Sequence, residues 1–322
     1  MVNGDVMLDR FKGTMLGCAV GDSVGGVIEL LNAVVVERDP ESLAARSPLP
    51  SVTVDLTSNA LTMVALAQAI TELGKFDRIH FAEKLARLYE NSEKGLRRVR
   101  YMDEDTEDAS RALAEGASPE ESGIETDSCE AAVRACAIGL RYYENPRELR
   151  EAATSQASLT HKGDEAAAGA VAIARAISLC LTCGADLDVP AFLSEVASSI
   201  EKLSEPMSEK IAGLDSFLDA PPRQAFDRLG SRPGAFSAIP GAIYSFLRTP
   251  GDFVGSVGFA TNLGGVAAAR AAMAGSLSGA LNGLSAIPPQ MLETLEGWDY
   301  IEGLAQRLFT LTPAAKPPVR RI

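Results

Sequence analysis

The sequence predicts an all-α protein of about a dozen helices joined by short connections. Apolar residues recur with the i, i+3, i+4, i+7 spacing of a helix over long segments, and alternating strand-like patterns are nearly absent. Gly, Pro, Asn and Asp separate these segments, as is typical of turns between helices. The six clearest helical segments span residues 60–76, 78–93, 128–143, 146–160, 163–184 and 189–203.

Local signals predict where individual helices begin and end. Asn145 precedes Pro146, which is the order of a capping residue followed by proline in the first helical turn. Gly184 ends a long alanine-rich run and is expected to stop that helix. The single short strand candidate is the segment 32–39 (NAVVVERD).

The chain is expected to form one domain over residues 1–312, followed by a loose tail over residues 313–322. A chain of 322 residues can bury a large core, and no repeat of fixed period divides it. Two polar or Pro/Gly-rich stretches, 104–127 and 218–240, are interpreted as surface excursions, because neither separates regions of different composition.

Composition excludes several classes of protein. The formal net charge of −13, with no basic stripe, argues against binding to nucleic acid. No apolar run approaches the roughly 20 residues that span a bilayer, and the first residues lack the pattern of a signal peptide. Five cysteines form no dense framework, and the Cys180-x-x-Cys183 pair has no second pair to complete a zinc site. These observations predict a cytoplasmic protein that does not act on membranes.

The segment 262–283 (NLGGVAAARAAMAGSLSGALNG) carries small residues near helical spacing. Each glycine inside a helix costs about 1 kcal/mol relative to alanine. Close approach of a second helix would compensate for that cost, because it requires small side chains. We therefore expect a central, tightly packed helix in this segment.

Four motifs in order resemble the ADP-ribosylglycohydrolase family, which includes the dinitrogenase-reductase-activating glycohydrolases and the J1 crystallins. The segment 10–29 (RFKGTMLGCAVGDSVGGVIE) is similar to the family opening R-x-x-G-x-x-x-G-x-A-x-G-D-x-x-G-x-x-x-E. The segments 128–140, 159–177 and 262–283 resemble the three later motifs. The resemblance implies a compact orthogonal bundle of helices around a cleft that holds two magnesium ions. It also implies an enzyme that cleaves the glycosidic bond between ADP-ribose and a protein side chain.

The sequence departs from the family pattern at the magnesium motifs. Residues 57–60 (TSNA) stand where the family has T-D-D-T, and residues 266–269 (VAAA) stand where it has D-T-D-T. A pair of magnesium ions needs several carboxylate ligands, and none remains at these positions. We therefore expect no metal cofactor. The family's ligand positions are occupied here by Ser58, Asn59, Val266 and Ala268.

Three carboxylates are candidate catalytic groups. Asp22 and Glu29 match acidic residues of the family opening, and Asp55 lies two residues before Thr57, where the first magnesium motif begins. Two of them have a structural alternative: Asp22 as a turn residue that caps a helix, and Asp55 as a solvent-facing residue of a strand-like segment. The resemblance also implies a ligand-binding set around the cleft, which consists of Thr57, Ser58, Asn59, Cys129, His161, Gly264 and Gly265.

The two histidines and the acidic segment have less specific interpretations. His161 matches an L-T-H motif of the family and could touch a ligand, but a lone histidine after a helix is more often a helix C-terminal charge or a buried hydrogen-bond partner. His80 lies on an amphipathic helix and is predicted to be structural. The acidic run 102–116 lacks the spacing of a calcium loop and is predicted to be a solvated face.

The absence of the magnesium-motif aspartates favours a pseudoenzyme that keeps the fold and binds ADP-ribose, a related nucleotide or an ADP-ribosylated protein. One alternative is a metal-independent hydrolase that uses two of Asp22, Glu29 and Asp55, whose carboxyl groups would then lie roughly 5 to 9.5 Å apart. Another is a structural or protein-interaction role. Metal-dependent hydrolysis with relocated ligands is the least favoured reading. The sequence leaves the oligomeric state open.

Overall fold

The computed structural model describes residues 3–34, 56–94, 102–183, 187–230 and 234–312. Helices joined by short turns make up these ranges, and no strand occurs within them. A β-bridge links Ile124 to His161. The prediction of an all-α fold is therefore confirmed.

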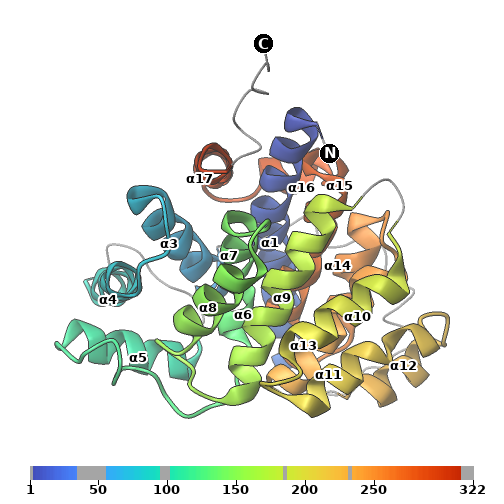
Figure 1. Ribbon diagram of the computed structural model, residues 1–322, viewed down its shortest axis with the longest axis horizontal. Helices are drawn as coiled ribbons and strands as arrows, with labels where there is room; N and C mark the ends of the chain where they lie inside the picture. Colours follow the sequence, from blue (N-terminus) through green and yellow to red (C-terminus); the bar gives the residue numbers. More distant parts are fainter. Residues whose placement is uncertain (1–2, 35–55, 95–101, 184–186, 231–233, 313–322) are drawn as a thin grey trace.

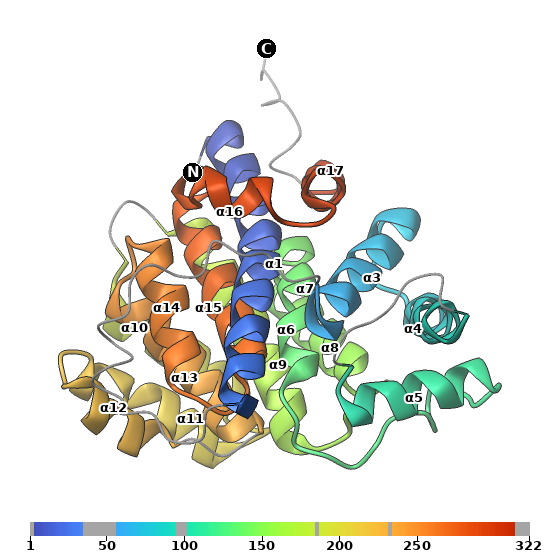
Figure 2. The same ribbon diagram turned by 180° about the vertical axis from the view of Figure 1, so that it is seen from behind.

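Two long helices, α1 (Gly4–Val34) and α15 (Ala267–Asn282), form the centre of the molecule. They lie side by side in Figures 1 and 2, and their contact is the most extensive among the described helices. Glycines at a spacing of four make this approach possible. A Cβ atom at any of them would collide with a carbonyl oxygen of the other helix; they are Gly13, Gly17, Gly21 and Gly25 of α1 and Gly275 and Gly279 of α15.

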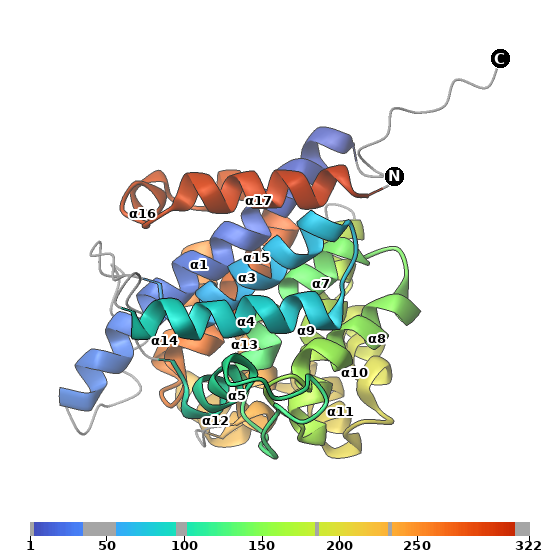
Figure 3. The same cartoon turned by 90° about the vertical axis from the view of Figure 1, so that its left-hand side faces the viewer.

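The other helices surround this pair. Those in contact with α1 or α15 include α3 (Ser58–Leu73), α9 (Asp164–Thr182), α13 (Ala235–Arg248), α14 (Phe253–Asn262) and α17 (Trp298–Thr310). Figure 3 shows α17 crossing the direction of α1 and lying next to α3. The remaining helices are α4 (Arg78–Glu93), α5 (Glu104–Ala114), α6 (Glu130–Arg134), α7 (Cys136–Arg141), α8 (Pro146–Ala157), α10 (Val189–Ile200), α11 (Glu205–Ala212), α12 (Pro222–Leu229) and α16 (Pro289–Glu293).

Helix α9 is the one described helix that is long and apolar enough to cross a membrane. Within the fold, 78% of its apolar window is buried inside the molecule. It contacts α6, α7, α8, α10 and α13, which is the position of a core helix. Arg10 of α1 caps its last turn by donating to the carbonyl oxygens of Cys180, Leu181 and Cys183. The Cys180 and Cys183 pair thus has a structural place at the C-terminal end of α9, where both carbonyl oxygens accept hydrogen bonds from Arg10.

Several predicted elements are confirmed. Helix α4 has the predicted bounds, and the side chain of Asn145 accepts a hydrogen bond from the Glu148 amide at the start of α8. Three expectations were wrong in part. The segment 128–143 is divided at Ala135 into α6 and α7, and α1 continues through 32–34, where a strand was expected. The two supposed excursions contain α5, α12 and the beginning of α13.

Other expectations fall on residues 35–55, 184–186 and 313–322, which lie outside the described residues. They include Asp55, the rest of the strand candidate, the helix stop at Gly184 and the tail.

Candidate functional site

Asp22 lies in the middle of α1, so the expectation that it is a turn residue was wrong. It nevertheless caps a helix, because its carboxylate meets the first turn of α3. The Thr57 amide donates to Oδ2 at 2.8 Å, and the Thr57 hydroxyl and the Asn59 amide group donate to Oδ1 at 2.5 and 3.2 Å. Burial raises the pKa of Asp22 to about 6, although these hydrogen bonds act in the opposite direction.

Glu29, two turns further along α1, caps a second helix. Its Oε1 accepts a hydrogen bond at 2.8 Å from the amide of Ala268, in the first turn of α15. Burial raises the pKa of Glu29, and the nearby carboxylates of Asp22 and Glu130 add to the increase; the Ala268 amide opposes it. The two described candidate carboxylates are therefore both bound to helix N-termini, at the segments that correspond to the family's magnesium motifs.

The residues of the first magnesium motif are enclosed. Thr57, Ser58 and Asn59 are each at most 6% exposed. Thr57 is the N-cap of α3, and its hydroxyl oxygen also accepts from the Asn59 amide nitrogen. The side-chain oxygen of Asn59 is buried, and no described residue donates a hydrogen bond to it. The side chains of this turn supply only neutral oxygens, and the Asp22 carboxylate that reaches the turn accepts hydrogen bonds from Thr57 and Asn59.

Arg270 lies close to the second motif and was missed by the sequence interpretation. Its side chain is fully buried, and its Nη1 donates to the carbonyl oxygen of Gly264 at 2.5 Å. The atoms Nε and Nη2 are buried and have no hydrogen-bond partner in the part of the chain that the structure describes. Burial lowers the pKa of Arg270 to about 10, against the effect of Cys129 and Glu29. The single charge within an otherwise apolar helix was the available signal.

Two glycines shape the surroundings of this arginine. A Cβ atom at Gly241 in α13 would collide with Nε of Arg270. Gly264 and Gly265 have φ angles of 70° and 62°, which is the left-handed region that favours glycine. The NLGG turn therefore has a backbone reason for its glycines, and it directs the Gly264 carbonyl oxygen to the guanidinium group.

Cys129 and Glu130, at the start of α6, lie between the surroundings of Arg270 and those of His161. The Cys129 thiol is buried, and burial together with the charge of Glu130 raises its pKa well above the usual value. Arg270, Asp103 and Glu29 are also near enough to influence that pKa. Glu130 accepts a short hydrogen bond from the Ser128 hydroxyl.

His161 is fully buried and lies on the other side of Glu130. Its Nδ1 is 2.6 Å from Thr160 Oγ1, while its Nε2 lies 3.6 Å from Asp103 Oδ1 and 3.7 Å from Glu130 Oε2. Burial alone would lower the pKa of His161, but the two carboxylates outweigh it and raise the pKa. The prediction that the acidic run forms a solvated face was therefore wrong for Asp103, which faces this histidine and caps α5 through the Thr106 amide.

Arg134 shares the Thr160 hydroxyl with His161 and was also missed. It is fully buried, and its guanidinium group donates to Gln156 Oε1 at 2.6 Å and to Thr160 Oγ1 at 2.5 Å. Burial lowers the pKa of Arg134 to about 10. His80, in contrast, lies at the surface and pairs with Glu72 at 2.6 Å, in agreement with a structural role.

Comparison with known proteins identifies the class of fold. A family model described as ADP-ribosylglycohydrolase matches residues 3–318. A solved structure, described as an ADP-ribosylglycohydrolase-related protein complex, superimposes with a TM-score of 0.73 at 25% identity and covers 95% of this chain and 98% of that chain. The chain belongs to the ADP-ribosylglycohydrolase family.

Three relatives show the range of similarity. A protein of Archaeoglobus fulgidus is 32% identical, covering 95% of this chain and 97% of its own length. ADP-ribosylarginine hydrolase Tri1 of Pseudomonas putida is 28% identical, with 95% and 79% covered. ADP-ribosylhydrolase ARH3 of Homo sapiens is 24% identical, with 94% and 93% covered.

Proposed function

We propose that this chain is a member of the family that does not perform magnesium-dependent hydrolysis and that binds ADP-ribose or a related nucleotide without metal. The absence of magnesium-dependent hydrolysis is supported by one observation: two carboxylates of α1 cap the N-termini of α3 and α15. Asp22 and Glu29 accept hydrogen bonds from the first turns of α3 and α15, the two turns from which the family's metal ligands would come.

The donor set does not fit a pair of magnesium ions. Magnesium binds carboxylate oxygens in near-octahedral geometry, whereas Ser58 and Asn59 offer neutral oxygens, and Val266 and Ala268 offer hydrocarbon. The buried guanidinium of Arg270 adds a positive charge near Glu29, which opposes a divalent cation there. No step of hydrolysis is therefore assigned to magnesium in this protein.

The metal-independent hydrolase is less well supported by the same geometry. A general base must be within reach of the proton that it abstracts. Asp22 is fully buried, and three hydrogen bonds from Thr57 and Asn59 occupy its carboxylate. Glu29 is partly exposed, but one of its oxygens is held by Ala268.

Arg270 supports the ligand-binding part of the proposal. A buried guanidinium with two unpartnered nitrogens is costly, and an anion that accepts from them would remove that cost. Arginine is well suited to phosphate, because its planar fork donates two parallel hydrogen bonds. The diphosphate of ADP-ribose provides such an anion, and two relatives are named for ADP-ribosyl hydrolysis.

Isothermal titration with ADP-ribose tests this proposal. Chelator-treated protein is expected to bind ADP-ribose with the same affinity in the presence and absence of millimolar magnesium. The variant Arg270→Lys is expected to bind at least about tenfold more weakly, because a lysine loses the fork geometry. Arg10→Lys is the matched control, since Arg10 is also buried but donates to three carbonyl oxygens at the end of α9.

Two outcomes would contradict the proposal. Binding that requires magnesium would show that the metal site has been rebuilt from other ligands. Absence of binding in both conditions would rule out the proposed nucleotide binding and favour a structural or protein-interaction role.

A further inference from the structure

We propose that Asp103, Asp105 and His161 bind one divalent transition-metal ion, with Zn²⁺ as the best-fitting ion. The site uses α5 and the turn after α8, and thus none of the segments that correspond to the family's magnesium motifs. It does not use Arg270, which supports the proposed nucleotide binding.

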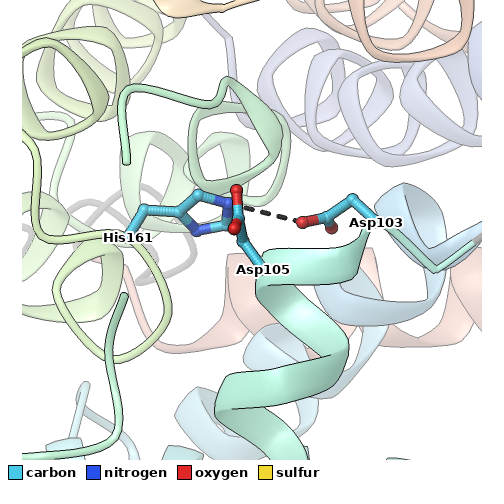
Figure 4. A group of neighbouring side chains, drawn as sticks. All are labelled: Asp103, Asp105 and His161. Atoms are coloured by element: carbon cyan, nitrogen blue, oxygen red, sulfur yellow. Dashed lines mark ion pairs between the residues drawn. The ribbon is translucent and has the colours of Figure 1, made fainter. Parts of the chain in front are cut away.

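The three side chains converge from two separate parts of the chain. One ligand atom from each lies within 4.8 Å of the others. Figure 4 shows Asp103 and Asp105 at the beginning of α5, with His161 reaching toward them from the opposite segment. Helix α5 places the two carboxylates close together, because Asp103 is its N-cap and Asp105 lies in its first turn.

The distances leave room for an ion. His161 Nε2 is 3.6 Å from Asp103 Oδ1 and 3.7 Å from Glu130 Oε2, which is longer than a hydrogen bond. Two ligand atoms on one zinc ion lie about 3.3 to 3.7 Å apart, because Zn–N and Zn–O bonds are about 2.0 to 2.2 Å long. The spacing around Nε2 therefore suits a shared metal.

Unpartnered buried atoms point to a missing ligand. His161 Nε2 and Asp103 Oδ2 are both buried and have no hydrogen-bond partner among the described residues. Burying such atoms without a partner costs free energy, which a bound cation would recover. His161 is also held for this role: with its proton on Nδ1 and donated to Thr160 Oγ1, the Nε2 lone pair is directed at the carboxylates.

Charge also favours a divalent cation. Asp103, Asp105 and Glu130 contribute three negative charges, and Arg134 contributes one positive charge, so two negative charges remain uncompensated when His161 is neutral. Asp105 makes no hydrogen bond or ion pair with any described residue. One imidazole with carboxylates suits zinc or manganese, whereas magnesium and calcium prefer oxygen ligands alone.

Titration of the chelator-treated full chain with zinc chloride tests the site. The wild type is expected to bind one equivalent, and Asp105→Asn is expected to weaken binding at least about tenfold. Asp105→Asn removes a ligand charge but no described contact, so the fold should persist. Glu107→Gln is the matched control, because Glu107 is an exposed carboxylate on the same helix. It should bind zinc like the wild type.

Two further readouts identify the ligands. Saturating zinc should raise the melting temperature of the wild type by about 4 °C and that of Asp105→Asn by less, because the variant binds zinc more weakly. Cobalt at the site should give visible d–d bands without the near-ultraviolet charge transfer of cysteine thiolate. Excess magnesium should not displace the bound cobalt. Failure of the wild type to bind zinc, equal binding by Asp105→Asn, or thiolate charge transfer would each overturn the proposal; in the first case, protonated His161 simply pairs with the carboxylates.

Discussion

Replacing Gly275 with alanine is expected to lower the free energy of unfolding by about 3 kcal/mol or more, and Gly17→Ala should do the same. Each new Cβ atom would collide with a backbone carbonyl oxygen of the facing helix, so the clash cannot be relieved by rotating a side chain. Helices α1 and α15 would have to separate along their whole contact. Urea denaturation followed by circular dichroism measures the change.

Gly303→Ala provides the matched control. Gly303 also lies inside a helix, α17, but the nearest atom to its added Cβ belongs to the flexible side chain of Arg307 at 3.6 Å. Alanine should therefore stabilise the protein by about 0.5 to 1 kcal/mol, because it has the higher helix propensity. If Gly275→Ala were as stable as Gly303→Ala, the close packing of α1 on α15 would be contradicted.

The stability of the wild type relative to Asp22→Asn is expected to fall by about 2 kcal/mol between pH 4 and pH 7. Burial raises the pKa of Asp22 from 3.8 to about 6 in the folded protein. Between these two values the folded state holds a proton that the unfolded state has released, so stability decreases as pH rises. Above the folded pKa, the protein contains a buried charge that the amide variant lacks.

Chemical denaturation of both proteins at several pH values tests whether the stability difference falls as pH rises. The amide of Asp22→Asn keeps an oxygen for the Thr57 amide and does not titrate, so the difference between the proteins isolates this carboxyl group. A difference that grows in favour of the wild type with rising pH would show a lowered pKa, and the hydrogen bonds from Thr57 and Asn59 would then outweigh burial.

The helical class was predictable because periodicity and caps are local, and α4 and the start of α8 follow those signals directly. The helical structure of the middle of α1 was not predictable in this way. Its glycines resemble a turn when the sequence is considered alone, but contact with α15 compensates for their low helix propensity. The interruption at Ala135, between α6 and α7, has no glycine or proline at that position to signal it.

The candidate site was predictable only in part. The sequence located Asp22, Glu29 and His161, but their partners depend on tertiary contacts between distant segments. Asp103 was assigned to a solvated acidic run because nothing nearby in the sequence indicates that it faces His161. Arg270 was overlooked because its importance comes from burial against Gly241 of another helix.

An assay of ADP-ribose release from an ADP-ribosylarginine substrate with millimolar magnesium tests the central claim most directly. The account predicts no release above that of the protein-free reaction, because Asp22 and Glu29 cap helices and the magnesium-motif positions carry no carboxylate. Circular dichroism of the same sample confirms that the protein is folded. Release that depends on magnesium and stops on chelation would contradict the account.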